Sequence, residues 1–257
     1  DIWDQNKKRI FEEPKIEYVL RCLYSLTKSI NRLKKDNSSI NIKLLIIDDN
    51  SKPDNLDKIK DILNKNYPKY SIINHNKEEH KEKIFDHTND NTFSNLSSLL
   101  KCFETAEKES SDLIYFVEDD YLHFENSLTD MINTYERISS QIEKDIIICP
   151  CDYPFNYMTH EKTNIFIGSN QHWRTVQKIL CTFMISKNML EKYWDNLKKT
   201  CERRNNPFEK YLNEILLNEI GISPINTLSI HLTNVNSSYG LSPFVDIKKL
   251  WDENNIN

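Results

Sequence analysis

The chain of 257 residues carries a net charge of −5, from 34 Lys and Arg against 39 Asp and Glu. Its lysines are interleaved with acidic and amide residues and form no basic stripe, which argues against nucleic acid as the main partner. Because the sequence contains only three glycines, a glycine-rich phosphate loop of the P-loop or dinucleotide-binding type is excluded.

The lack of linkers, the short apolar runs and the cysteine pattern narrow the class of protein further. The apolar runs are too short to span a membrane, and no Pro/Gly/Ser-rich linker or internal repeat divides the chain. The six cysteines lie mostly in apolar patterns without a CxxC pair, which is typical of reduced core residues. We therefore expect a single domain over residues 1–257 in a cytoplasmic protein without a transmembrane segment, free to associate peripherally with a membrane.

Apolar spacing along the chain predicts an alternation of helices and strands. Apolar residues recur every three to four positions in the helical segments, and short β-branched runs mark the strands. Such alternation favours an α/β fold with a mainly parallel central sheet and helices on both faces. After residue 150 the pattern loosens, and residues 236–257 read as an irregular tail. The predicted helices are 15–34, 54–64, 96–106, 128–138, 189–197 and 208–216, and the predicted strands are 42–47, 70–73, 113–117, 145–149, 164–168, 182–185 and 225–232, with a polar loop at 74–93.

An apolar run at residues 113–117 ends abruptly in three acids, Glu118, Asp119 and Asp120. The run is typical of a buried strand, so the three carboxyl groups would share a small space at its carboxyl end. Carboxylates held so near to one another raise each other's pKa. A hard divalent cation with oxygen ligands is the usual way to keep them ionised. The sequence therefore suggests a metal site here, with a solvated acidic turn as the alternative.

The predicted strand at residues 42–47 also ends in acids. Asp48 and Asp49 follow it, and Asn50 and Ser51 lead into the next helix. Helix capping explains Asn50 or Ser51 but does not require two preceding aspartates. Ligands of open α/β sheets bind outside the carboxyl ends of the strands, so two acidic corners in one sheet predict a shared crevice.

These motifs, in this order and spacing, resemble the GT-A class of nucleotide-sugar glycosyltransferases, and in particular its broad family 2 type, over residues 9–232. Residues 17–26 resemble the first helix of that family, and residues 46–51 resemble its acidic corner at the nucleotide. Residues 116–120 resemble a variant of its D-x-D metal motif. The resemblance implies a Rossmann-like GT-A fold.

The same resemblance implies a donor half at residues 1–150, which binds a UDP- or GDP-sugar, and an acceptor half at residues 151–235. The implied activity is transfer of the sugar, with inversion, to a hydroxyl of a glycan, a lipid-linked or a protein acceptor. Mn²⁺ or Mg²⁺ would be held by Asp120, with Glu118 and His231 as further ligands, and would offset the charge of the departing nucleoside diphosphate.

The remaining donor contacts also follow from the resemblance. Asp49 would face the base or ribose, and Asp48, Glu118 and Asp119 would line the nucleotide sugar beside it. Two departures from the family pattern stand out. The family begins with a strand before its first helix, whereas residues 1–8 are too polar for such a strand. The first position of the metal motif is Glu118 rather than Asp, which lengthens its reach.

An inverting transfer needs a carboxylate that takes the proton of the acceptor hydroxyl. The family often supplies this carboxylate at the start of a helix, and Glu209 opens the predicted helix at 208–216. Glu209 is therefore the first candidate for the base, and Asp152 is the second. An acid in a first helical turn is also favoured by the helix dipole alone.

Residues 171–174 fall in a predicted polar loop between two strands. There Trp173 could stack on a sugar ring, and Arg174 could contact phosphate with two hydrogen bonds. Equally, Trp173 could anchor the loop in the core, and Arg174 could be a surface charge.

Three other functions fit parts of the sequence. A phosphoacceptor receiver domain would use the corner at 46–51 with Asp119 as the phosphorylated residue, but the separation from Asp49 is too long and the expected Lys-Pro corner is missing. A nucleotidyltransferase shares the sheet architecture but needs a glycine-rich loop. A non-catalytic nucleotide- or sugar-binding module on the same scaffold stays open, because a fold does not determine a function.

Overall fold

The computed structural model describes residues 9–232 and 240–256. Residues 1–8, which were compared with the first strand of the GT-A family, lie outside this part, as does the start of the predicted tail. The helices are α1 (Lys15–Asp36), α2 (Pro53–Asn66), α3 (Asp90–Glu109), α4 (Ser127–Ile142), α5 (Lys187–Lys192), α6 (Trp194–Glu202), α7 (Lys210–Ile215) and α8 (Ile247–Glu253), with short turns η1 (Lys77–His80) and η2 (Pro154–Tyr157). The strands are β1 (Leu44–Asp48), β2 (Tyr70–Asn74), β3 (Leu113–Phe116), β4 (Tyr121–His123), β5 (Ile146–Ile148), β6 (Ile165–Ile167), β7 (His172–Val176), β8 (Phe183–Ser186), β9 (Ile220–Pro224) and β10 (Ser229–His231).

The described strands form one large sheet and two separate pairs. The large sheet has the order β3-β8-β5-β9-β7-β6, and within it β5 and β9 pair in parallel while its other neighbours pair antiparallel. Outside it, β1 pairs in parallel with β2, and β4 pairs antiparallel with β10. The predicted α/β class is confirmed. The predicted mainly parallel central sheet is wrong, because β7 and β8 run against both of their neighbours.

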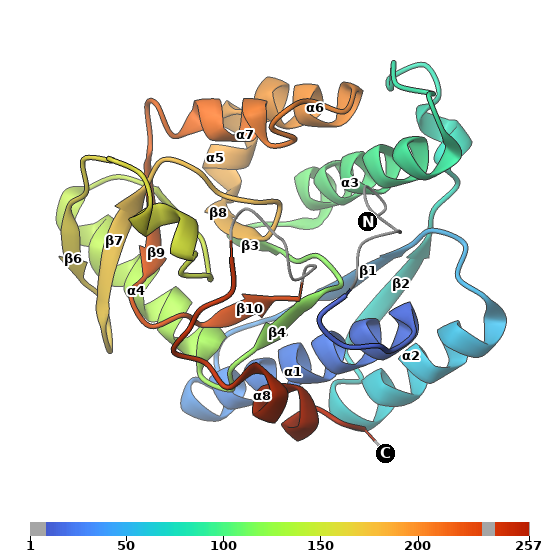
Figure 1. Cartoon of the computed structure of the whole chain (residues 1–257), viewed down its shortest axis with the longest axis horizontal. Coiled ribbons are helices and arrows are strands. Elements are labelled where there is room, and N and C mark those ends of the chain that lie inside the picture. The colour runs from blue at the N-terminus through green and yellow to red at the C-terminus, as the bar shows by residue number, and fades with distance from the viewer. Residues whose placement is uncertain (1–8, 233–239, 257) are drawn as a thin grey trace.

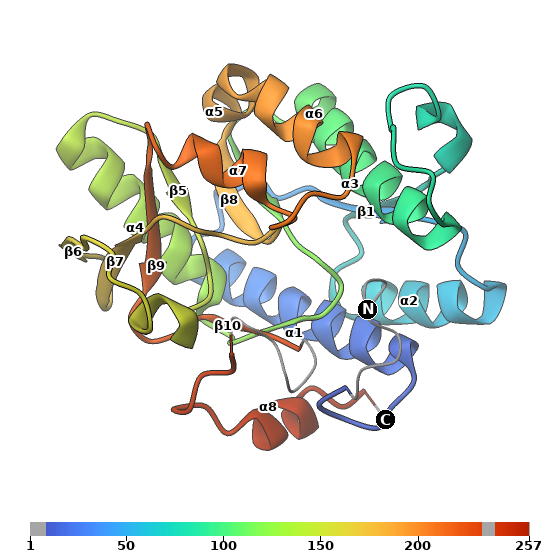
Figure 2. The same cartoon turned by 45° about the horizontal axis from the view of Figure 1, so that its top comes forward.

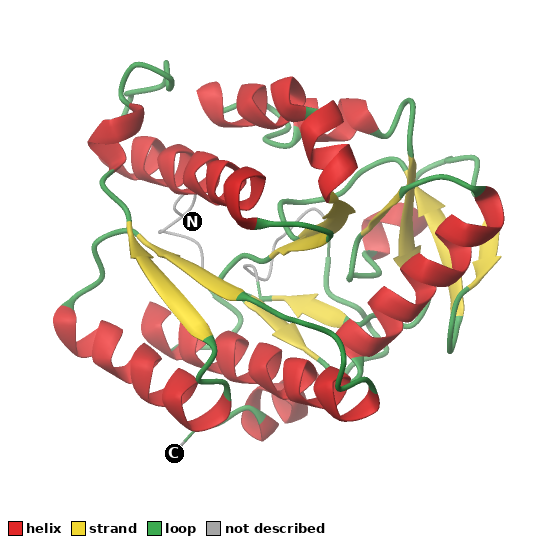
Figure 3. Ribbon diagram, turned by 180° about the vertical axis from the view of Figure 1, so that it is seen from behind, coloured by secondary structure: helices red, strands yellow, loops and turns green. Residues whose placement is uncertain are grey.

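Helices cover the strands from two sides (Figure 1, Figure 2 and Figure 3). On one side lie α3 and the later helices α5, α6 and α7, and on the other lie α1, α2 and α4. The long helix α1 packs against α2, α4 and β4, because its apolar residues recur at helical spacing and form one buried face. This arrangement matches the prediction of helices on both faces.

The centre of the large sheet is buried on both faces. All three isoleucines of β5 are at most 1% exposed. Ile147 belongs to a core that includes Phe116 and Phe183 and packs under α3, α5, α6 and α7. Ile146 and Ile148 belong to a second core, on the side of α1 and α4. A strand covered on both faces needs a continuous apolar run, which explains why β5 does not alternate polar and apolar residues.

The predicted loop at residues 171–174 is wrong for His172, Trp173 and Arg174, which belong to strand β7. Trp173 is completely buried in the core on the α4 side, so it offers no surface on which a sugar could stack. Arg174 leaves the opposite face of the strand and is also buried. The sequence did not indicate this strand because Trp173 is flanked by two polar residues, the exposed His172 and the buried Arg174.

The late part of the chain contains more structure than was predicted. Within the expected strand at 225–232 only Ser229–His231 form a strand, β10, and the preceding strand β9 was not predicted. The short strand β4 was not predicted, and the tail contains helix α8, whose Leu250 and Trp251 are buried against α1. The predicted loop at 74–93 includes η1 and the first turn of α3. The prediction of an irregular tail is therefore wrong for the described residues of α8.

The cysteines agree with their prediction as reduced residues. All six are free, and all but Cys102 are buried. Among the described residues, no helix is both long and apolar enough to cross a membrane.

Replacement of Gly168 by Ala is predicted to destabilise the protein. A Cβ atom at Gly168 would lie 2.3 Å from Cδ1 of Trp173 and 2.8 Å from Oγ1 of Thr134, and the buried indole cannot move aside. We expect a loss of roughly 1–3 kcal/mol in the free energy of unfolding, measured by urea denaturation. The neighbouring Ser169→Ala, at an exposed side chain, serves as the control. Equal stability of both variants would show that Trp173 does not pack against Gly168.

Candidate functional site

The three acids after β3 lie in the short connection between β3 and β4. Strand β4 begins at Tyr121 and pairs with β10, where Tyr121 is the partner of His231. This pairing brings His231 from a distant part of the chain to Asp120, with 3.2 Å between Nε2 of His231 and Oδ2 of Asp120. The backbone N–H of Leu232 also donates to the carbonyl oxygen of Asp120, at 2.8 Å. The structure therefore places His231 beside Asp120.

Two tyrosines support the pair of Asp120 and His231. The ring of Tyr121 stacks on the imidazole of His231, with centroids 4.5 Å apart and planes 10° from parallel. The hydroxyl of Tyr121 shares a hydrogen bond of 2.8 Å with the hydroxyl of Tyr153, and both side chains are buried. Because the ring of His231 is held by stacking, it is fixed in orientation toward Asp120.

Glu118 is held by Thr182, which immediately precedes β8. The backbone N–H of Glu118 donates to Oγ1 of Thr182 at 3.0 Å, and the hydroxyl of Thr182 faces Oε2 of Glu118 at 3.4 Å. Burial, followed by repulsion from Asp120, raises the pKa of Glu118. Thr182 thus fixes the position of Glu118, while burial and Asp120 oppose ionisation of the Glu118 carboxyl group.

The pKa values of Asp120 and His231 depend on burial and on the neighbouring charges. Burial opposes ionisation of Asp120, but the His231 ring holds its pKa below the ordinary value. Burial also opposes protonation of His231, but Asp120 and then Glu118 hold its pKa above the ordinary value. The cluster therefore favours an ionised Asp120 and attracts positive charge.

Glu209 joins the cluster from the other side. It is the residue before α7, and its carboxyl group interacts electrostatically with Glu118 and His231. Burial raises the pKa of Glu209 to about 7, against a weaker effect of His231. Of the two candidates for a base, Glu209 is the one that the structure brings to the acids after β3.

Asp119 points away from this cluster. Its side chain is half exposed and accepts a hydrogen bond of 2.7 Å from Nζ of Lys15, the first residue of α1. Lys15 is thereby the positive charge that lies next to the acidic connection. Its position suggests contact with an anionic ligand at the same edge.

Asp48 and Asp49 lie at the carboxyl end of β1, where the sequence placed them. Asp48 is buried, and its carboxylate accepts the backbone N–H of Ser51 at 3.3 Å. Asp49 accepts the hydroxyl of Ser94 from α3. Because β1 is not part of the large sheet, the predicted crevice between the two acidic corners is not formed by neighbouring strands of one sheet.

Asp152 follows β5 and is engaged elsewhere. Both of its carboxylate oxygens face the hydroxyl of Tyr157, at 3.0 and 2.9 Å. Burial raises the pKa of Asp152 to about 6, although Tyr157 and Arg174 favour the ionised form. Asp152 and Arg174 therefore form a group of their own, on the side of β7 and β9.

The donors around Asp120 suit a divalent cation in kind. Carboxylate oxygens and an imidazole nitrogen are ligands that Mn²⁺ accepts, and Oδ1 of Asp120 is buried without a hydrogen-bond partner. In residues 9–232 and 240–256, no three His, Cys, Asp or Glu side chains are already arranged to hold a metal ion. Binding would therefore require the contact between Asp120 and His231 to open.

Several residues of the site carried no clear signal in the sequence. Thr182 begins an apolar strand and looked like a strand residue, and Lys15 looked like one surface lysine among many. Tyr121 and Tyr153 follow acids and were not distinguished from core aromatics. Their roles depend on pairings between distant segments, which local sequence does not contain.

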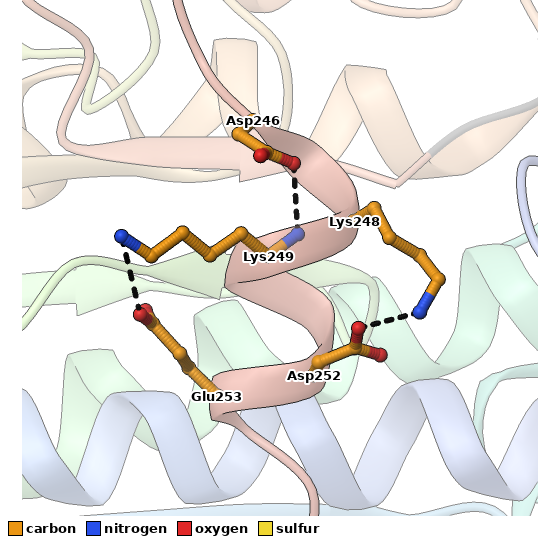
Figure 4. Close-up of a pocket in the computed structure, with 5 residues that line it drawn as sticks. All are labelled: Asp246, Lys248, Lys249, Asp252 and Glu253. Atoms are coloured by element: carbon orange, nitrogen blue, oxygen red, sulfur yellow. Dashed lines mark hydrogen bonds and ion pairs between the residues drawn. The ribbon is translucent and has the colours of Figure 1, made fainter.

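A surface hollow lies on α8 and is lined by charged side chains (Figure 4). Its charged side chains satisfy one another: the carboxylate of Asp246 caps the backbone N–H of Lys249 at 2.9 Å, Nζ of Lys249 lies 3.8 Å from Glu253, and Lys248 pairs with Asp252. It shares no residue with the cluster around Asp120. We assign no function to it.

Comparison with known proteins found no match, either among protein-family models or among curated proteins.

Proposed function

We propose that this protein is a metal-dependent glycosyltransferase that moves a sugar from a UDP- or GDP-sugar to an acceptor hydroxyl with inversion. The observation that carries the proposal is the convergence of Glu118 and Asp120 with His231 and Glu209, which come from three separate segments. A solvated acidic turn would not need a stacked histidine on one acid or a buried glutamate facing the group. The GT-A resemblance of residues 9–232 supports the same activity.

The cation would be held by Asp120, with Glu118 and His231 as further ligands. Bound there, Mn²⁺ or Mg²⁺ would supply positive charge for the departing nucleoside diphosphate. The protein contributes the alignment: Thr182 positions Glu118, and Tyr121 holds the ring of His231. Residues that orient metal ligands in this way raise affinity without touching the ion.

Glu209 would act as the general base. Its pKa of about 7 allows it to be ionised near neutral pH and still to accept a proton. It takes the proton of the acceptor hydroxyl, whose oxygen then attacks the sugar as the bond to the diphosphate breaks. Asp152 is the weaker candidate, because the hydroxyl of Tyr157 occupies both of its oxygens.

The donor nucleotide would lie between α1 and the end of β1. Lys15 would approach the diphosphate, since it already lies beside the acids that would carry the cation. Asp48 and Asp49 would face the ribose or base. The acceptor, a glycan, a lipid-linked or a protein hydroxyl, would approach from the side of Glu209.

Nucleotide binding is predicted to require a divalent cation. The acids after β3 repel a diphosphate unless their charge is offset, and the chain has no glycine-rich loop to hold phosphate instead. We expect the affinity for UDP or GDP, measured calorimetrically, to fall by roughly 10–100-fold when Mn²⁺ is replaced by EDTA. Asp120→Asn should show the weaker affinity even with Mn²⁺, whereas the control Asp252→Asn on α8 should not. Equal affinities in EDTA and Mn²⁺ would rule out a bridging cation.

Glu209→Gln is predicted to lower transfer by roughly 10²–10⁴-fold while donor affinity persists, because the amide keeps the shape and loses the basicity. In the wild type, Glu209 must be ionised to act, so kcat/KM should fall as pH decreases below about 7 and level off above it. Glu209→Gln should lack this acidic limb, and Glu214→Gln on the same helix should keep it. An unchanged pH profile in Glu209→Gln would assign the base to another residue, with Asp152 next to be tested.

A further inference from the structure

A second polar group lies on the outer face of β7 and β9, away from the core on the α4 side. Arg174 of β7 is paired directly with Ser223 of β9, and on its other side with Ile165 of β6. Directly opposed residues of antiparallel strands point to the same face of a sheet. Arg174 and Ser223 therefore share one face, while Trp173 occupies the other.

Arg174 is a buried cation whose direct contacts are neutral groups. Its side chain is 6% exposed, and Nη2 donates to the carbonyl oxygen of Asn156 at 3.1 Å and faces Oγ1 of Thr163 at 3.4 Å. The guanidinium lies over the ring of Tyr157, with 4.6 Å between Cζ and the centroid. Asp152 interacts with the guanidinium electrostatically, but both carboxylate oxygens of Asp152 face the hydroxyl of Tyr157. A buried charge without an opposite charge in contact is costly, and a bound anion would remove that cost.

Besides Oγ1 of Thr159 and Oε2 of Glu161, three buried polar atoms on η2 and on the Arg174 face of β7 and β9 have no hydrogen-bond partner. They are Nε of Arg174, Nδ2 of Asn156 and Oγ of Ser223, and their side chains are at most 6% exposed. The two nitrogens can only donate, and the hydroxyl can donate as well. Buried polar groups are nearly always paired, so three unpaired donors at this place favour an acceptor. Several oxygens that carry negative charge satisfy all of them at once.

The group is accessible from solvent at Tyr157. This side chain covers the guanidinium and is itself 56% exposed, and the following Met158 is 83% exposed. The hydroxyl of Tyr157 is held by Asp152 rather than by the core. Tyr157 is therefore an exposed cover over the guanidinium.

The group also has a fixed relation to the acidic cluster. Asp152 is followed by Tyr153, whose hydroxyl bonds to that of Tyr121, the residue after Asp120. The backbone N–H of Asp152 donates to Thr227, two residues before β10 and its His231. A ligand at Arg174 is thus connected to the proposed donor site through Asp152 and Tyr153 and stays separate from its acids, as an acceptor would.

We infer that Arg174, Asn156 and Ser223 bind an anionic group, a carboxylate or a phosphate, on the acceptor. Arg174 supplies the charge and an N–H pair, and Asn156 and Ser223 donate to the remaining oxygens. That the anionic group belongs to the acceptor rests on the proposed glycosyl transfer. That an anion binds at Arg174 does not rest on it.

The test is a thermal-shift titration of the full chain in EDTA, without nucleotide, with D-glucuronate, D-glucose 6-phosphate and neutral D-glucose. A ligand that binds the native state raises Tm by mass action. We expect a saturable rise with at least one anionic sugar and none with glucose. A response to glucuronate identifies a carboxylate, and a response to the phosphate ester identifies a phosphate. Arg174→Gln should weaken binding by about 100-fold and Ser223→Ala by about tenfold, since charge-assisted hydrogen bonds are the stronger ones.

Arg137→Gln, at an exposed arginine of α4, is the matched control and should bind like the wild type. If Arg174→Gln fails to fold, Ser223→Ala decides, because it removes only one oxygen. Absence of any response, an equal response to glucose, or unchanged affinity in the folded variants would overturn the inference. None of these measurements uses a donor, a cation or turnover, so their failure leaves the proposed transfer to its own tests.

Discussion

Repulsion among the carboxylates that follow β3 is the constraint on which the rest of the site depends. Each of the three acids is compensated by a different element: Asp119 by Lys15 at the start of α1, Asp120 by His231 of β10, and Glu118 by the hydroxyl of Thr182. The fold therefore collects segments far apart in sequence around one acidic connection. The compensation is incomplete, since the pKa of Glu118 stays raised and Oδ1 of Asp120 has no partner. The negative charge that stays uncompensated favours the binding of a divalent cation.

The pairing of β4 with β10 gives this arrangement its rigidity. It places Tyr121 under the ring of His231, and the same tyrosine reaches Tyr153 across the loop after β5. The acidic cluster and the group around Asp152 and Arg174 are consequently joined by one buried hydrogen bond between two hydroxyls. A transferase that must hold a donor and an acceptor in a fixed relation needs a connection of this kind, because small displacements of the reacting groups reduce the rate strongly.

The sequence predicted the elements whose signal is local. The apolar spacing of α1 and the strand that ends at Glu118 could be read directly, and the position of His231 beside Asp120 was suggested by family resemblance. Strand direction could not be read, because an apolar run such as β8 packs equally well in either direction. Trp173 and Arg174 were placed in a loop because a buried arginine looks like a surface charge until η2 is seen to cover it. Thr182 could not be identified, since its partner lies 64 positions away.

The most direct test is diffraction from crystals grown with UDP and Mn²⁺, recorded at the manganese absorption edge. The proposed function predicts an anomalous peak bonded to Asp120, with diphosphate oxygens on the same ion and Glu209 facing the site. A peak at another surface, or UDP bound while the contact between Asp120 and His231 remains closed, would contradict it.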